Sequence, residues 1–208
     1  NHEFDAGEAE LQRLLAGGCA ATRADSPAQS CVQHSYSGAR FPLIAANISR
    51  RHGAPLFAPS WVRQVGPVQV GFIGAVTRTT PSIVLPSGIT GLAFGDEAEA
   101  INRAAAELQA RGVQALVAVV HEGGELAQAG ADWNDERCPG WQGALAELER
   151  RITPAVDVIL SAHTHQGYRC KLGERVVVQA TSYGRGVSVV DLPTNPHTGR
   201  VDRNAIQS

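Results

Sequence analysis

The sequence predicts a layered α/β domain, because apolar runs of strand length alternate with amphipathic helical patterns along the chain. The 208 residues are enough for one sizeable domain with a buried core. An apolar fraction of 43% against a charged fraction of 18% is typical of a globular chain and excludes a disordered one.

Three helices are expected. The most strongly patterned helix has an acidic first turn, places Ile101, Ala105 and Leu108 on one face, and stops at Gly112. The helix nearest the N-terminus groups its leucines on one face and ends at a glycine pair. The three expected helices lie within 7–18, 95–112 and 141–152.

Six apolar runs have the length of strands. Residues 113–121 and 155–163 are almost continuously apolar, which is typical of strands that are buried on both faces. The stretch 60–92 is rich in Pro and Gly and is expected to be partly a long surface loop. The six runs lie within 40–48, 68–77, 113–121, 155–163, 175–181 and 186–192.

Charge and hydropathy exclude two classes of partner. A net charge of −2 gives no bulk electrostatic attraction for nucleic acid. No apolar run approaches about 18 residues, so no membrane span is expected. No signal peptide is visible, and the chain contains no Met, which leads us to expect a processed or truncated N-terminus.

The four cysteines are expected to form disulfides. They make no close C-x-x-C pair, so a zinc ribbon or a thioredoxin-like motif is not expected. An even number of cysteines in loop settings indicates an oxidising compartment, and four free buried thiols are the alternative. Three pairings are open, and we favour the two that close loops, Cys19–Cys31 and Cys138–Cys170.

Three histidines stand at the carboxyl ends of the two buried strands. His121 ends one strand, and His163 and His165 follow the other in the run "SAHTH". Ligands of α/β sheets bind at this edge, where the three imidazoles should lie near one another. This grouping favours a role as metal ligands over a purely structural role. The other histidines in loops, which are expected to be solvated, are His34, His52 and His197.

Six segments in order resemble the calcineurin-like metallophosphoesterases, in the branch of the bacterial 5'-nucleotidases. They are "NHEFD", "FPLIAANI", "VGFIGAVT", "VVHEGGE", "SAHTHQGYRC" and "SYGRGVSVVDL". The resemblance covers nearly the whole chain, from Asn1 to about Val201. It implies a β-sandwich of two mixed sheets flanked by helices, with two divalent metal ions at one rim.

The resemblance also implies the metal ligands. Asn1, His121 and His163 would bind one ion, and His165 would bind the other. Imidazole nitrogens favour Zn or Mn, whereas Mg or Ca could serve as substitutes in an assay.

The N-terminal motif is implied to act on the phosphoryl group. His2 matches the family's catalytic histidine, and Asp5 matches the carboxylate that orients it. A carboxylate favours the cationic imidazole, which can stabilise phosphoryl charge or protonate a leaving alkoxide. The alternative is that Asp5 is a helix N-cap, and both can hold. Glu3 is expected to make a structural hydrogen bond, and Asn47 either fixes a loop or takes part in catalysis.

The chain also departs from the family's pattern. The family carries a D-x-H motif and a G-D motif upstream of Asn-His-Glu, and this sequence contains no D-x-H. Its single Gly-Asp pair, Gly95-Asp96, begins a predicted helix instead. We therefore expect 1–208 to be one catalytic domain that is incomplete at its N-terminus, with 195–208 starting a linker. The family's C-terminal substrate domain is expected to be missing.

The resemblance implies metal-dependent hydrolysis of nucleotide phosphomonoesters by a periplasmic or secreted bacterial protein. Related activities of the same scaffold remain open, namely a 2',3'-cyclic nucleotide phosphodiesterase, a UDP-sugar hydrolase and a thiosulfohydrolase. A different class also remains open, in which this chain by itself is an inactive fragment or a non-enzymatic module.

Overall fold

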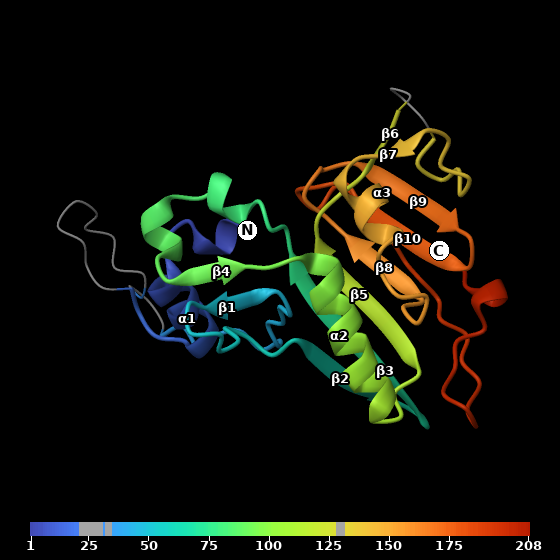
Figure 1. Ribbon diagram of the computed structural model, residues 1–208, viewed down its shortest axis with the longest axis horizontal. Coiled ribbons are helices and arrows are strands. Elements are labelled where there is room, and N and C mark those ends of the chain that lie inside the picture. Colours follow the sequence, from blue (N-terminus) through green and yellow to red (C-terminus); the bar gives the residue numbers. More distant parts are fainter. Residues whose placement is uncertain (21–30, 32–34, 128–131) are drawn as a thin grey trace.

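The computed structural model describes residues 1–20, 31, 35–127 and 132–208 (Figure 1). The helices are α1 (Glu8–Ala16), α2 (Glu97–Ala110) and α3 (Ala144–Glu149), with 3-10 helices η1 (His2–Phe4), η2 (Thr80–Ser82), η3 (Pro86–Ile89) and η4 (Arg203–Ala205). The strands are β1 (Ile48–Arg50), β2 (Ser60–Val65), β3 (Val68–Val76), β4 (Leu92–Phe94), β5 (Ala115–His121), β6 (Glu125–Leu126), β7 (Trp141–Gln142), β8 (Val158–Ser161), β9 (Gly167–Leu172) and β10 (Arg175–Ala180).

A mixed six-stranded sheet forms the centre of the molecule, in the order β2-β3-β5-β8-β10-β9. Its four inner strands are parallel, and the two edge strands are antiparallel to their neighbours. The described residues also form two short two-stranded sheets, β1-β4 and β6-β7. Because the inner strands run the same way, their carboxyl ends share one edge of the sheet.

Helices α2 and α3 cover one face of this sheet (Figure 1). Asp96 is the N-cap of helix α2, and its side chain accepts the N–H of Glu99 at 3.0 Å. The apolar face of α2 then packs on β3 and β5, where Ile101, Leu108 and Leu116 are fully buried. This layer is the main core of the domain.

The opposite face of the sheet carries a smaller apolar cluster. Valines of β5, β8 and β10 pack there against the C-terminal segment, including Val201 and Ile206. A third cluster joins η1, α1 and the start of β1 to the end of β3. Gly74 belongs to this junction, because the N–H of Ala46 donates to its carbonyl at 2.8 Å and a Cβ there would collide with the Ile44 carbonyl oxygen.

The predicted α/β class, with a mixed sheet flanked by helices, is confirmed. Every predicted helix is present, and five of the six apolar runs contain all or part of a strand. Residues 186–190 belong to no strand, although their composition favours one. A strand needs a neighbour for its backbone hydrogen bonds, and the described residues provide none there. Residues 60–65 form edge strand β2 where a loop was expected.

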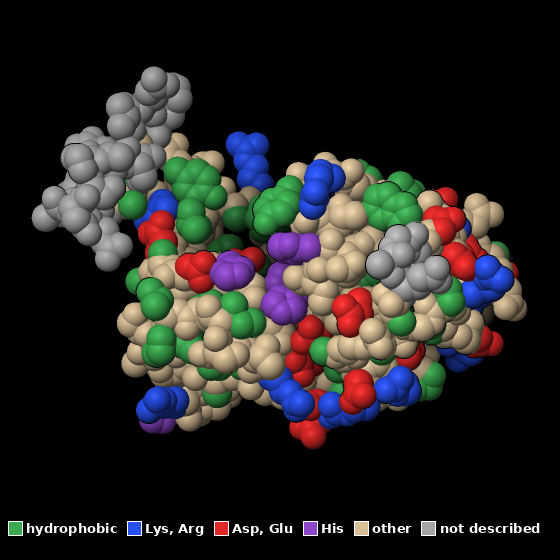
Figure 2. Space-filling view, turned by 90° about the horizontal axis from the view of Figure 1, so that it is seen from above, with side chains coloured by type: hydrophobic (Ala, Val, Ile, Leu, Met, Phe, Trp, Pro, Cys, Tyr) green, Lys and Arg blue, Asp and Glu red, His purple; other side chains and the backbone are tan. Residues whose placement is uncertain are grey.

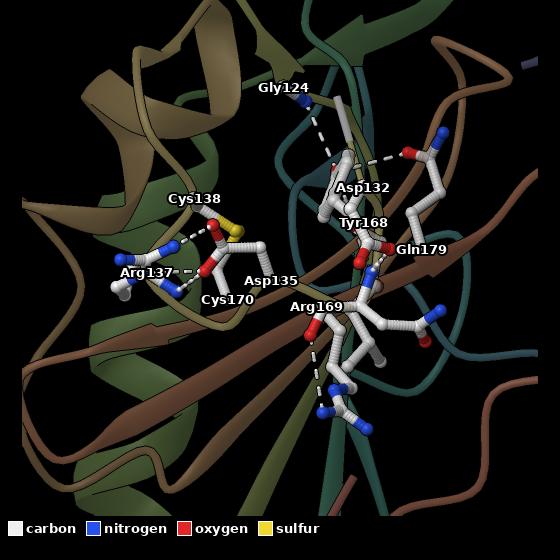
Figure 3. The surroundings of a disulfide bond; sticks show 12 residues. Gly124, Asp132, Asp135, Arg137, Cys138, Tyr168, Arg169, Cys170 and Gln179 are labelled. Atoms are coloured by element: carbon white, nitrogen blue, oxygen red, sulfur yellow. Dashed lines mark hydrogen bonds and ion pairs between the residues drawn. A yellow bond between two sulfur atoms is a disulfide. The ribbon is translucent and has the colours of Figure 1, made fainter. Parts of the chain in front are cut away.

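Both favoured disulfides are present. Cys19 pairs with Cys31, and Cys138 pairs with Cys170, each at a Cα–Cα distance of 5.4 Å. The second bond ties the loop before β7 to strand β9, beside the Asp135–Arg137 ion pair (Figure 3). Within the described residues, no helix has the length and hydropathy needed to cross a membrane.

Removal of the Cys138–Cys170 bond should lower the free energy of unfolding. The bond joins two buried cysteines that lie 32 positions apart in the sequence. A double Cys→Ala variant should therefore lose about 3–4 kcal/mol of unfolding free energy. Urea denaturation of the oxidised chain measures the loss. The Cys19→Ala/Cys31→Ala variant opens a shorter loop and removes cysteines that are less buried, so it should lose less. Equal midpoints for wild type and the Cys138/Cys170 variant would contradict the prediction.

Candidate functional site

The predicted histidine cluster lies at the carboxyl edge of the six-stranded sheet. His121 ends β5 and is paired in register with Val76 at the end of β3. His163 and His165 lie in the loop that follows β8, the other neighbour of β5. Figure 2 shows histidine side chains gathered near the middle of one face of the molecule. Parallel register therefore brings together residues that are more than 40 positions apart in the sequence.

Asn1, His121 and His163 form the centre of this site. The ring centroids of the two histidines are 5.2 Å apart, and Nδ2 of Asn1 lies 3.5 Å from Nδ1 of His163. Asn1 is buried, and its Oδ1 accepts the N–H of His2 at 2.8 Å, which leaves one lone pair on that oxygen. The arrangement brings two imidazoles and one side-chain amide together on converging elements.

Burial sets the protonation state of His121. Burial of the imidazole, and next the positive N-terminal ammonium and His163, together lower the pKa of His121 to about 4 against the opposing charge of Glu3. The ring is therefore neutral near pH 7, and a neutral imidazole has the free lone pair that a metal ligand needs. Glu3 accepts a hydrogen bond from the N-terminal ammonium at 2.8 Å, as its expected structural role requires.

His165 does not join the Asn1–His121–His163 group. Its ring packs edge-to-face on Tyr183, with centroids 5.4 Å apart. Both His163 and His165 have positive φ values, 74° and 58°, which non-glycine residues adopt rarely. Strain of this kind persists only where the surrounding structure fixes it, and it is frequent at functional sites.

A buried polar network holds the strained His-x-His loop. Thr164 Oγ1 donates to the Gly124 carbonyl at 2.8 Å and accepts from Gln179 Nε2 at 3.2 Å. The Tyr168 hydroxyl lies 2.7 Å from Ser161 Oγ, accepts from the Gly124 N–H and donates to Gln179 Oε1 (Figure 3). Sequence reasoning did not find this network. The one available signal was the polar Gln179 inside the apolar run of β10.

The N-terminal pair is assembled as expected. His2 Nδ1 lies 2.9 Å from Asp5 Oδ2, and both side chains are more than half exposed. No described residue bonds to His2 Nε2. The alternative role of Asp5 as the N-cap of α1 is wrong, because the capping residue is Gly7 and Asp5 ends η1 instead.

The remaining polar candidates have structural roles or lie outside the histidine cluster. Asn47 fixes a loop: its Nδ2 donates to the carbonyls of Val76 and Gly95, and its Oδ1 accepts the N–H of Val76. His52 and His197 are exposed in loops, and His34 lies outside the described residues. Across the described ranges, no three His, Cys, Asp or Glu side chains gather as a metal site, so the central group depends on the amide of Asn1.

This chain is similar in sequence to parts of larger known proteins. No protein-family model matches it. Endonuclease YhcR of Bacillus subtilis is 35% identical over 95% of this chain and 15% of its own length. Cell wall protein Lmo0130 of Listeria monocytogenes is 30% identical over 96% of this chain and 26% of its own length. The chain thus spans no more than about a quarter of these relatives.

Solved structures share the fold. The 5'-nucleotidase precursor of Thermus thermophilus matches the whole chain and 36% of its own, with a TM-score of 0.66 and 26% identity. The calcineurin-like phosphoesterase YfkN of Bacillus subtilis matches 80% of this chain and 54% of its own, with a TM-score of 0.64 and 22% identity. The sheet and its histidine rim define a phosphoesterase-type α/β domain. The chain is thus similar in sequence and fold to the calcineurin-like phosphoesterases, with 5'-nucleotidases among its relatives.

Proposed function

We propose that this chain forms part of the catalytic domain of a metal-dependent phosphoesterase that hydrolyses nucleotide phosphomonoesters. The observation that carries the proposal is the convergence of Asn1, His121 and His163 at the carboxyl edge of the sheet. The relatives that carry 5'-nucleotidase names support this substrate class. The parent protein is proposed to be exported by a bacterium, which the two disulfides and the cell-wall relative support.

The donor set fits divalent metal ions. Asn1, His121 and His163 would hold one ion, and His165 would contribute to a second, with Zn or Mn favoured by the imidazole nitrogens. Such ions activate water and neutralise charge on phosphoryl oxygens. The neutral state of His121 suits this role, since a protonated imidazole cannot bind a metal.

His2 and Asp5 would act on the phosphoryl group itself. Asp5 holds Nδ1 of His2 at 2.9 Å, which fixes the tautomer and orientation of the ring. Nε2 is then the nitrogen that faces a substrate. In its cationic form the ring can stabilise negative charge on the phosphoryl oxygens and protonate the leaving alkoxide.

Metal removal and restoration test the proposal. The full-length protein that contains this chain should release phosphate from AMP, lose this activity after dialysis against a chelator, and regain it on addition of Zn or Mn. Metal content by elemental mass spectrometry should fall and rise in step. Parallel assays with 2',3'-cyclic AMP and UDP-glucose separate the related activities of the scaffold. A full-length protein that neither retains metal nor releases phosphate from any of these substrates would overturn the proposal.

A further inference from the structure

A buried glutamine on β10 lies against the loop that carries His163 and His165. Gln179 is 3% exposed and follows three buried valines of this strand. Burial of a side-chain amide costs free energy unless its donors and its acceptor are paired. The partners of this amide therefore indicate why a polar residue occupies an otherwise apolar stretch.

The amide of Gln179 holds the residues on both sides of His165. Its Nε2 donates to the Gln166 carbonyl at 2.9 Å and to Thr164 Oγ1 at 3.2 Å. A carbonyl can only accept, so the bond to Gln166 fixes which end of the amide faces the loop. Oε1 accepts from the Tyr168 hydroxyl at 3.1 Å. His165 therefore lies between two neighbours that the same side chain anchors.

The hydroxyl of Thr164 also ties this loop to the one that follows His121. Thr164 Oγ1 donates to the Gly124 carbonyl at 2.8 Å. Gly123 permits the close approach, because a Cβ there would lie 2.3 Å from Thr164 Oγ1. Hydrogen bonds thus run from Gln179 through the His-x-His loop to the loop after β5.

The conformation of His165 depends on support of this kind. Its φ is 58°, and a non-glycine residue keeps such a value only where the surrounding structure fixes it. The side chain is exposed, so its own burial does not hold it in place. The backbone on either side must do so, and Gln179 binds there.

We propose that Gln179 is a positioning residue, which holds His165 in the conformation that binds the second metal ion. This inference rests on the proposed metal-dependent function, in which His165 contributes to that ion. Residues that orient metal ligands commonly change metal affinity by about 10- to 100-fold when they are substituted. Gln179 contacts the neighbours of His165 alone among the proposed ligands, so its effect should be confined to one of the two ions.

Titration of Mn into the chelator-treated full-length protein provides the test. Isothermal titration of wild type should show two binding events, and His165→Ala should identify the event that belongs to His165. Gln179→Leu should weaken that event by about 10- to 100-fold and leave the other unchanged.

Gln179→Leu should fold, because leucine is compatible with an apolar strand and both loop partners keep a second bond. Thr164 still donates to Gly124, and the Gln166 carbonyl still accepts the N–H of Thr181 at 2.9 Å. Thr164→Val is a second variant of nearly the same shape as wild type. It removes the hydroxyl that Gln179 and Gly124 share, and it should weaken the same binding event.

Asn102→Leu is the matched control. The amide of Asn102 also holds the backbone on both sides of one residue, since Nδ2 donates to the Arg151 carbonyl at 2.9 Å and Oδ1 accepts the N–H of Thr153 at 2.7 Å. This clamp precedes β8, whereas the His-x-His loop follows it. Asn102→Leu should leave both Mn-binding events unchanged.

A double variant separates positioning from a general loosening of the fold. In the His165→Ala background, Gln179→Leu should have no further effect on Mn binding, because it acts through His165. A further loss in the double variant, an equal loss in Asn102→Leu, or two events that Gln179→Leu leaves unchanged would overturn the positioning role alone. A wild-type protein that binds no ion sensitive to His165→Ala would overturn the proposed second metal ion, and the positioning role with it.

Discussion

Substitution of His163 by Ala is expected to reduce AMP hydrolysis by roughly a thousandfold, because a metal that stabilises charge in the transition state contributes several kcal/mol. His163 stands at the centre of the candidate site, 3.5 Å from the amide of Asn1 and edge-on to His121. The measurement is kcat/KM for AMP together with bound metal by elemental mass spectrometry. Both should fall together, while the thermal unfolding midpoint should change little, because the side chain is only partly buried and no part of the main core depends on it.

Two control variants make this result interpretable. His197→Ala removes an exposed imidazole from a turn distant in sequence from the site and should change neither activity nor metal content. His2→Asn should lower kcat while leaving metal content near that of wild type, since His2 is assigned to the phosphoryl group. Unchanged turnover in His163→Ala would disprove the metal assignment. A parallel loss of metal in His2→Asn would disprove the separate role of His2.

The elements that the sequence predicts well are those in which one local pattern determines the outcome. Helix α2 has an N-cap, an acidic first turn, an apolar face and a terminal glycine, and all of these indicate the same boundaries. Strands β5, β8 and β10 are mostly apolar runs that only the centre of a sheet can bury. Edge strand β2 lacks such a pattern because most of its residues are exposed, and its existence depends on pairing with β3.

In the candidate site, too, some residues could be placed from the sequence and others could not. Placement of His121 and His163 at strand ends was predictable, because parallel strands bring their carboxyl ends to one edge. The network of Tyr168 and Gln179 was not, because it depends on the register that sets these two residues opposite each other in β9 and β10. The contact of His165 with Tyr183 also depends on two positive φ values, which no local pattern in the sequence encodes.

The largest expected loss of stability is at Arg175, a buried cation that joins β10 to the end of α3. Its Nε donates to the carbonyl of Val156 at 3.0 Å, and its terminal nitrogens donate to the carbonyls of Glu149, Ile152 and Thr153. One terminal nitrogen also lies 2.7 Å from Oε1 of Glu149. Burial lowers the pKa of Arg175 against the opposing effect of Glu149. The guanidinium nevertheless remains charged at neutral pH.

Arg175→Ala should therefore lower the free energy of unfolding by about 3–5 kcal/mol, because it leaves a largely buried carboxylate and several carbonyls without a donor. Arg150→Ala is the matched control at the same helix end. Its side chain is 64% exposed and lies 3.6 Å from Glu147, so its loss should cost less than about 1 kcal/mol. Urea denaturation of both variants measures the difference. Similar small losses would mean that water replaces the guanidinium at the end of α3, and that the six-stranded sheet does not need this residue to keep its helical layer in place.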